Sequence, residues 1–192
     1  MQHYLSKVLK ASKKQSKRLK KLQKPILLLS VGFLLFFSGL YHYLSIRRLS
    51  FSEVPQTNVS ERGSSPINIS IPSIEVNVQV ENGAIKNGVW DISYDKATYL
   101  VSSQKPGIPG NTVIYAHNKK ALFGSLPYLS IGQKIYVKTQ DGVEHVYEVY
   151  RKDFVKPDRV DLVSPTDNEE LTLFTCWGLF DSDRVVVKAK PI

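Results

Sequence analysis

The chain has 192 residues, which is long enough for one domain of ordinary size with additional segments. Hydrophobic residues make up 42% and charged residues 22%, a composition that excludes wholesale disorder. Nine of the 26 basic residues fall within residues 1–24, where no acidic residue occurs, so the other 17 basic residues balance the 17 acidic ones. Because phosphate binding needs a basic surface on the folded domain, the net charge of +9 does not predict a nucleic-acid partner.

An apolar segment that is long enough to cross a membrane follows the basic N-terminal tail. The 21 residues from Ile26 to Ile46 carry no formal charge and would extend about 31 Å as a helix, against roughly 30 Å for a bilayer core. A cleaved signal peptide would have a shorter apolar core and small residues at its cleavage site, which residues 41–48 do not offer. We therefore predict a cytoplasmic tail over residues 1–24, a single-pass anchor over residues 25–46 and an extracellular remainder, because basic residues favour the cytoplasmic side.

The remainder divides into a linker and one β-rich domain. Residues 47–65 are polar, contain Pro55 and Gly63 and show no sustained period, which is typical of a linker. From Pro66 onward, short apolar or alternating runs separated by turns predict an all-β barrel or sandwich over residues 66–192. Strands are expected over residues 67–71, 74–80, 112–116, 134–139, 143–154, 171–175 and 184–190, with a hairpin turn at Asp141-Gly142.

Cys176 is the only cysteine of the chain, and an unpaired thiol outside the cell is unusual. The end of the strand 171–175 would hold this thiol in place yet open it toward solvent, as a nucleophile needs. Arg184 begins the next predicted strand, where its guanidinium could stabilise an oxyanion near the thiol. The alternatives are a buried, inert cysteine and a solvated arginine paired with Asp181 or Asp183.

His117 ends another predicted strand and is the candidate partner of the thiol. A cysteine nucleophile acting on an amide needs a group that protonates the departing amine, and histidine titrates nearest neutral pH. His3 and His42 lie in the tail and the predicted span, and His145 lies within a hairpin strand, where a surface or packing role is expected. Metal-ligand spacing does not occur among the His, Cys and acidic residues, so no metal or other cofactor is predicted.

Three sequence motifs resemble those of the sortase family. The segment Thr172-Leu173-Phe174-Thr175-Cys176 matches the TLxTC motif, and Arg184-Val185-Val186-Val187 resembles the strand that bears the family's essential arginine. His117 in Tyr-Ala-His-Asn resembles the family's histidine at the end of a central strand. The resemblance covers about residues 66–192, preceded by an anchor and a linker in the family's usual order.

The resemblance implies a closed eight-stranded β-barrel and a transpeptidase activity. Cys176 would cleave an LPxTG-like sorting signal between Thr and Gly through an acyl-enzyme, and His117 would protonate the departing glycine amine. Arg184 would hold the carbonyl oxygen, and Thr175 would line the substrate groove. The partners implied are surface proteins bearing the sorting signal and an amine acceptor such as a cell-wall peptide.

Some features narrow the resemblance, and two rival interpretations stay open. The short loop between Cys176 and Arg184 is similar to that of the compact class D or E sortases, and residues 153–170 are expected to read the sorting motif.

One rival is a non-catalytic, membrane-tethered surface-binding β-domain. The other is a different cell-wall cysteine hydrolase, although in papain-like chains the cysteine precedes the histidine, whereas His117 precedes Cys176 by 59 residues.

Overall fold

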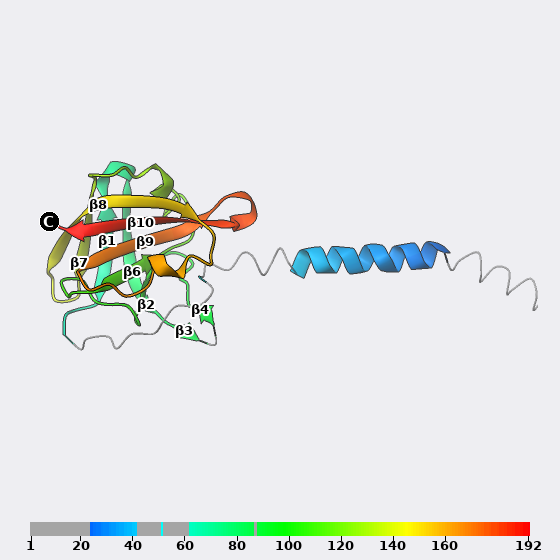
Figure 1. Cartoon of the computed structure of the whole chain (residues 1–192), viewed down its shortest axis with the longest axis horizontal. Helices are drawn as coiled ribbons and strands as arrows, with labels where there is room; N and C mark the ends of the chain where they lie inside the picture. The colour runs from blue at the N-terminus through cyan, green and yellow to red at the C-terminus, as the bar shows by residue number, and fades with distance from the viewer. Residues whose placement is uncertain (1–23, 42–50, 52–61, 87) are drawn as a thin grey trace, which may run out of the picture. The chain divides into compact units, whose positions relative to one another are not determined.

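The structure, a computed structural model, describes residues 24–41, 51, 62–86 and 88–192. The chain divides into two units, Met1–Ser45 and Ile46–Ile192, which are described separately. In the first unit, an α-helix over Lys24–Tyr41 is long and apolar enough to cross a membrane (Figure 1). The end of the predicted span, residues 42–46, lies outside the described residues.

The second unit contains a closed barrel of eight strands, as the resemblance implied, in the order β1-β2-β5-β6-β9-β10-β8-β7 (Figure 1). Its strands are β1 (Pro66–Ile71), β2 (Val76–Gly83), β5 (Ala97–Leu100), β6 (Asn111–Tyr115), β7 (Lys134–Thr139), β8 (Glu144–Val155), β9 (Glu170–Trp177) and β10 (Asp183–Pro191). A separate two-stranded sheet pairs β3 (Ile85–Lys86) with β4 (Val89–Trp90).

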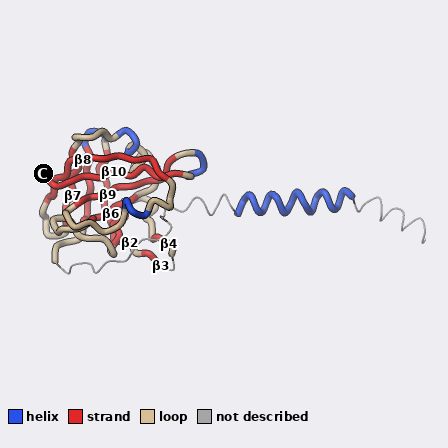
Figure 2. The backbone as a smooth tube through the Cα atoms, viewed as in Figure 1, coloured by secondary structure: helices blue, strands red, loops and turns tan. Residues whose placement is uncertain are grey.

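Among the described residues of this unit, helix is limited to short 3-10 turns, as Figure 2 shows. These are η1 (Pro72–Ile74), η2 (Leu126–Tyr128), η3 (Val160–Leu162) and η4 (Leu179–Asp181). The predicted hairpin joins β7 to β8, where Gly142 adopts a φ of 87° that favours glycine. Thr139 closes the turn, because its hydroxyl lies within hydrogen-bond distance of two acceptors, the Asp141 carboxylate at 2.6 Å and the Val143 carbonyl at 2.9 Å.

Two hydrophobic cores lie on opposite faces of the strands β6, β9 and β10. Alternate side chains such as Leu171, Leu173 and Val185 fill the barrel interior. Their neighbours Phe174 and Val186 point outward into a second core. These three strands are therefore buried on both faces over most of their length, which explains apolar runs such as Val185-Val186-Val187.

Phe51, Trp90, Leu162 and Val163 contribute to the second core from outside the barrel strands. The rings of Phe51 and Phe174 meet edge to face with centroids 4.9 Å apart. Phe51 is 1% exposed although it falls within the predicted linker, so at least this residue of the segment packs against the domain. The outer face of β6, β9 and β10 is therefore a covered surface.

Candidate functional site

Cys176 and Arg184 are direct partners in the antiparallel pairing of β9 with β10. Paired residues of an antiparallel ladder point to the same face of the sheet, with Cβ atoms roughly 4.5–5.5 Å apart. Cys176 belongs to the outer core, so this shared face is the outer one. The strand pairing therefore brings the predicted nucleophile and the predicted oxyanion donor side by side.

Cys176 is more enclosed than the sequence predicts. It is the penultimate residue of β9 rather than the last residue of the strand, and its exposed fraction is 4%. Burial raises the pKa of the Cys176 thiol to about 11; the Arg184 guanidinium opposes this rise, and Asp181 adds to it. With this pKa, the resting side chain at neutral pH is the protonated thiol. Because only 4% of the side chain is exposed, the expectation that the thiol opens toward solvent is wrong.

Arg184 is held inside the structure by main-chain carbonyls. Its Nη1 donates to the carbonyl oxygens of Asp181 at 2.9 Å and Asp183 at 2.8 Å. Its exposed fraction is 1%, and burial lowers the pKa of the guanidinium, whereas Cys176 and the two aspartates raise it. The alternative of a solvated arginine is therefore wrong, although both aspartates contact this residue.

His117 follows β6, which runs parallel to β9 with Tyr115 paired to Phe174. The ladder continues to the next residue, because the Ala116 amide donates to the Phe174 carbonyl at 3.3 Å. His117 and Cys176 each lie two residues beyond the pair Tyr115–Phe174 along these parallel strands. Its side chain is partly exposed, and burial lowers the pKa of the imidazole, as does the nearby Lys119, whereas Asp181 raises it.

Thr175 links the two strands that bear the histidine and the cysteine. Its hydroxyl is fully buried and donates to the Ala116 carbonyl at 2.8 Å. Ala116 directly precedes His117, and Thr175 directly precedes Cys176. The hydrogen bond therefore fixes the end of β6 against β9. In this structure Thr175 therefore has an observable structural task, whereas its predicted contact with substrate stays a prediction.

Asp181 connects the three candidate residues electrostatically. Its charge raises the pKa values of His117, Cys176 and Arg184. Its main-chain carbonyl accepts a hydrogen bond from Arg184 Nη1 at 2.9 Å. The sequence marked Asp181 only as an alternative ion-pair partner for the arginine. No motif pointed to it, since its place depends on the path of the loop between β9 and β10.

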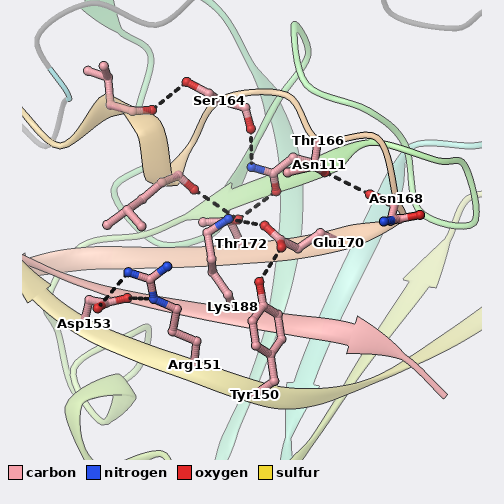
Figure 3. Close-up of polar contacts among 12 residues, drawn as sticks. Asn111, Tyr150, Arg151, Asp153, Ser164, Thr166, Asn168, Glu170, Thr172 and Lys188 are labelled. Carbon is pink, nitrogen blue, oxygen red and sulfur yellow. Dashed lines mark hydrogen bonds and ion pairs between the residues drawn. The ribbon is translucent and has the colours of Figure 1, made fainter.

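A polar cluster occupies the far end of the same outer face, as Figure 3 shows. Lys188 forms an ion pair with Glu170, both side chains being largely buried, and the Tyr150 hydroxyl donates to Glu170 at 2.5 Å. The Asn111 amide donates to the Ser164 carbonyl at 2.9 Å. These contacts fix the start of β9 and the loop 156–169, which overlaps the segment expected to read the sorting motif.

Metal chemistry has no evident site among the residues that the structure describes. In residues 24–41, 51, 62–86 and 88–192, no group of three or more His, Cys, Asp or Glu side chains could hold a metal ion. The reactive groups that the candidate site offers are the thiol, the imidazole and the guanidinium.

Comparison with known proteins identifies the family. Residues 69–192 match the sortase domain. The chain is 27% identical over 148 residues to sortase A of Bacillus anthracis, covering 72% of this chain and 68% of that protein. It is 33% identical over 93 residues to the putative sortase YwpE of Bacillus subtilis (strain 168), covering 46% of this chain and 89% of that protein.

Solved structures agree with this match. A lid mutant of sortase A from Corynebacterium diphtheriae has a TM-score of 0.57 and 27% identity, covering 69% of this chain and 73% of the other. Sortase C-1 from Actinomyces oris has a TM-score of 0.58 and 26% identity, covering 67% and 75% respectively. The fold is thus a sortase-type closed β-barrel. The chain belongs to the sortase family.

Proposed function

We propose that this protein is a cysteine transpeptidase that cleaves an LPxTG-like sorting signal between Thr and Gly and joins the new carboxyl end to an amine. The observation that carries the proposal is the direct pairing of Cys176 with Arg184 on one face of the sheet. His117 follows the neighbouring strand β6, two residues after Tyr115, as Cys176 is two residues after Phe174, the partner of Tyr115. A thiol, an imidazole and a guanidinium are together sufficient for acyl transfer.

The first half of the proposed reaction forms a thioester. The neutral imidazole of His117 accepts the proton of the Cys176 thiol, and the thiolate attacks the threonine carbonyl carbon. The Arg184 guanidinium donates hydrogen bonds to the oxygen that becomes negatively charged in the tetrahedral intermediate. As this intermediate collapses, the C–N bond breaks and the imidazolium gives its proton to the departing glycine amine.

The second half transfers the acyl group. An incoming amine attacks the thioester carbonyl, and His117 accepts the proton that this amine loses. The C–S bond then breaks, and the thiolate takes back a proton from the imidazolium. The product is a new amide, and the residues return to their resting protonation states. Burial of Cys176 limits access of water, which would hydrolyse the thioester instead.

The proposal includes where the reaction occurs and with which partners. The apolar helix over Lys24–Tyr41 would anchor the chain in the cell membrane, and the basic residues before it would stay in the cytoplasm. The domain would then face outward, where surface proteins with sorting signals and amine-bearing cell-wall peptides are accessible. The sequence resemblance to class D or E sortases stays a prediction.

One observation favours a second candidate, a non-catalytic surface-binding domain. Cys176 is buried within an apolar cluster, as an inert core cysteine would be. The two candidates differ in one respect, because only a transpeptidase must let a peptide carbonyl reach the sulfur atom.

The test uses the full chain in detergent with a set of LPxTG-like peptides and triglycine as the amine acceptor, and mass spectrometry identifies the products. The proposal predicts a product in which triglycine replaces the residues after threonine. Intact peptides after prolonged incubation, across the whole set and with the barrel folded, would favour the binding domain.

A further inference from the structure

The loop between β9 and β10 holds a strained backbone although its apolar side chains are exposed. Phe180 and Asp181 are consecutive non-glycine residues with φ values of 56° and 61°, in the left-handed region that L-residues disfavour. The side chains of Leu179 and Phe180 are 77% and 56% exposed, so their burial does not hold the backbone. Such strain persists where surrounding contacts impose it, and polar contacts of Asp183 and Arg184 lie at the end of this loop.

The Asp183 carboxylate joins the two ends of the loop. It accepts a hydrogen bond from the Ser182 hydroxyl at 2.6 Å. It also lies against the backbone of Gly178, where an added Cβ atom would be 2.5 Å from Oδ2 of Asp183. Gly178 has a φ of 79°, so both its conformation and this close approach require glycine. The carboxylate therefore packs across the loop, from its last residue to its first.

The same carboxylate ties the loop to β8. Oδ1 of Asp183 forms an ion pair with Nζ of Lys156 at 2.6 Å. Lys156 directly follows Val155, which pairs with Arg184 in the β8–β10 ladder. Lys156 and Ser182 hold the pKa of the Asp183 carboxyl below its usual range, so the ion pair is formed at neutral pH. Asp183 thus connects the β9–β10 loop to the first residue of the loop 156–169.

The main chain of Asp183 contacts the candidate oxyanion donor. Nη1 of Arg184 donates to the Asp183 carbonyl at 2.8 Å and to the Asp181 carbonyl at 2.9 Å. Arg184 is 1% exposed and is the ladder partner of Cys176. A shift of the main chain at Asp183 would therefore move an acceptor that orients the guanidinium beside the thiol. Through its side chain and its carbonyl, one residue connects Lys156 to Arg184.

We propose that Asp183 is a positioning residue of the candidate site, whose ion pair with Lys156 fixes the main-chain carbonyl that orients the Arg184 guanidinium. This inference rests on the proposed function, in which Arg184 stabilises the oxyanion. Oxyanion donors act because they are fixed before the charge develops, so a small displacement lowers the reaction rate. An ion pair whose lysine is 63% exposed adds little to global stability. Its loss should therefore alter kcat much more than the midpoint of thermal unfolding.

The kinetic test compares three variants of the full chain in detergent. Lys156→Met removes the cation, Lys156→Arg retains it, and Asp183→Asn removes the anion with little change of shape. The kcat for transfer of LPxTG-like peptides to triglycine should fall on the order of 10-fold in Lys156→Met and in Asp183→Asn. The double variant should be no slower than either single variant, because both changes remove one interaction. Lys156→Arg should keep most of the wild-type kcat.

Lys96→Met is the matched control. It removes the cation of another partly exposed ion pair, in which Lys96 Nζ lies 3.4 Å from the Glu81 carboxylate, and it should leave kcat unchanged. Lys156 lies within the segment expected to read the sorting motif, so KM is measured as well. A raised KM with unchanged kcat in Lys156→Met would assign Lys156 to peptide recognition and overturn the inference. An equal loss of kcat in Lys96→Met would overturn it too.

A readout without substrate separates this inference from the proposed function. The Nε–H group of the buried Arg184 side chain can be followed by ¹H–¹⁵N NMR. Its exchange with solvent should be faster in Lys156→Met and Asp183→Asn than in the wild type, and unchanged in Lys96→Met. This result together with absent peptide transfer would support the positioning of Arg184 and contradict only the proposed function. Unchanged exchange and an unchanged Nε–H chemical shift in both ion-pair variants would overturn the inference.

Discussion

Cys176 and Arg184 are eight positions apart in the chain and directly opposite each other in the β9–β10 ladder. The five-residue loop between the two strands, residues 178–182, therefore controls both side chains at once. The guanidinium in turn binds two carbonyls at the end of that loop. Nucleophile, oxyanion donor and loop form one structural unit, and changes in one should alter the others.

Replacement of Arg184 by lysine should lower kcat by about 100-fold or more, the magnitude found when oxyanion donors are removed. An ammonium group is a compact point charge and cannot reproduce the planar set of donors that holds two carbonyls and an oxyanion. Steady-state kinetics of peptide transfer measure the effect. Arg151→Lys, at an exposed arginine of β8, is the control and should retain activity. Wild-type kinetics in Arg184→Lys would contradict the proposed role.

Thr175→Val should separate the structural task of Thr175 from any contact with substrate. Valine keeps the shape but removes the hydroxyl that donates to the Ala116 carbonyl, at a cost of about 1 kcal/mol or somewhat more in unfolding free energy. We expect a lower midpoint of thermal unfolding and a several-fold lower kcat/KM. Thr175→Ser retains the donor and should restore both. Equal behaviour of the valine and serine variants would show that this hydrogen bond does not position the site.

The pH dependence of thiol labelling follows from the protonation states in the site. With a pKa of about 11, Cys176 is a thiolate in about one molecule in 10,000 at pH 7. The rate of alkylation by iodoacetamide should therefore be slow at pH 7 and rise about tenfold per pH unit until the pH approaches the pKa. A plateau already reached near pH 7 would contradict a protonated resting thiol.

Truncation of Phe51 should weaken the outer core. Its ring is buried against Phe174 and Trp90, so Phe51→Ala should reduce the unfolding free energy by about 3 kcal/mol. Labelling of Cys176, which belongs to the same cluster, should become faster. Tyr128→Ala, at a 72% exposed aromatic residue, should change neither quantity appreciably. Comparable losses in both variants would mean that Phe51 does not cover the domain.

The sequence predicted most of the barrel because its strands differ from their turns in composition. The strand β7 occurs over the residues expected, and β1, β6, β8, β9 and β10 differ by one or a few residues at their ends. The strand β5 was missed because Ala97–Leu100 has only four residues, one of them the polar Thr98, so that neither an alternation nor an apolar run marks it. The β3–β4 pair was missed because each strand has only two residues.

The catalytic roles of the candidate residues stay a prediction, whereas the structure does describe their environment. The TLxTC motif and the positions at the ends of predicted strands marked Cys176, His117 and Arg184, because motifs and strand ends can be recognised from the sequence. The enclosure of Cys176 depends on contacts between distant segments, such as the packing of Phe51 on Phe174. No local pattern encodes such contacts, and only the folded chain reveals them.

The central claim is that Cys176 forms a covalent acyl-enzyme with a sorting peptide. Its most direct test is intact-protein mass spectrometry of the full chain in detergent, quenched in acid during turnover of LPxTG-like peptides. The mass of Cys176-containing protein should increase by that of the peptide up to its threonine, and proteolytic mapping should localise this adduct to Cys176. A folded Cys176→Ala variant should show neither the adduct nor peptide transfer. Peptide transfer by Cys176→Ala, or an adduct on another residue, would contradict it.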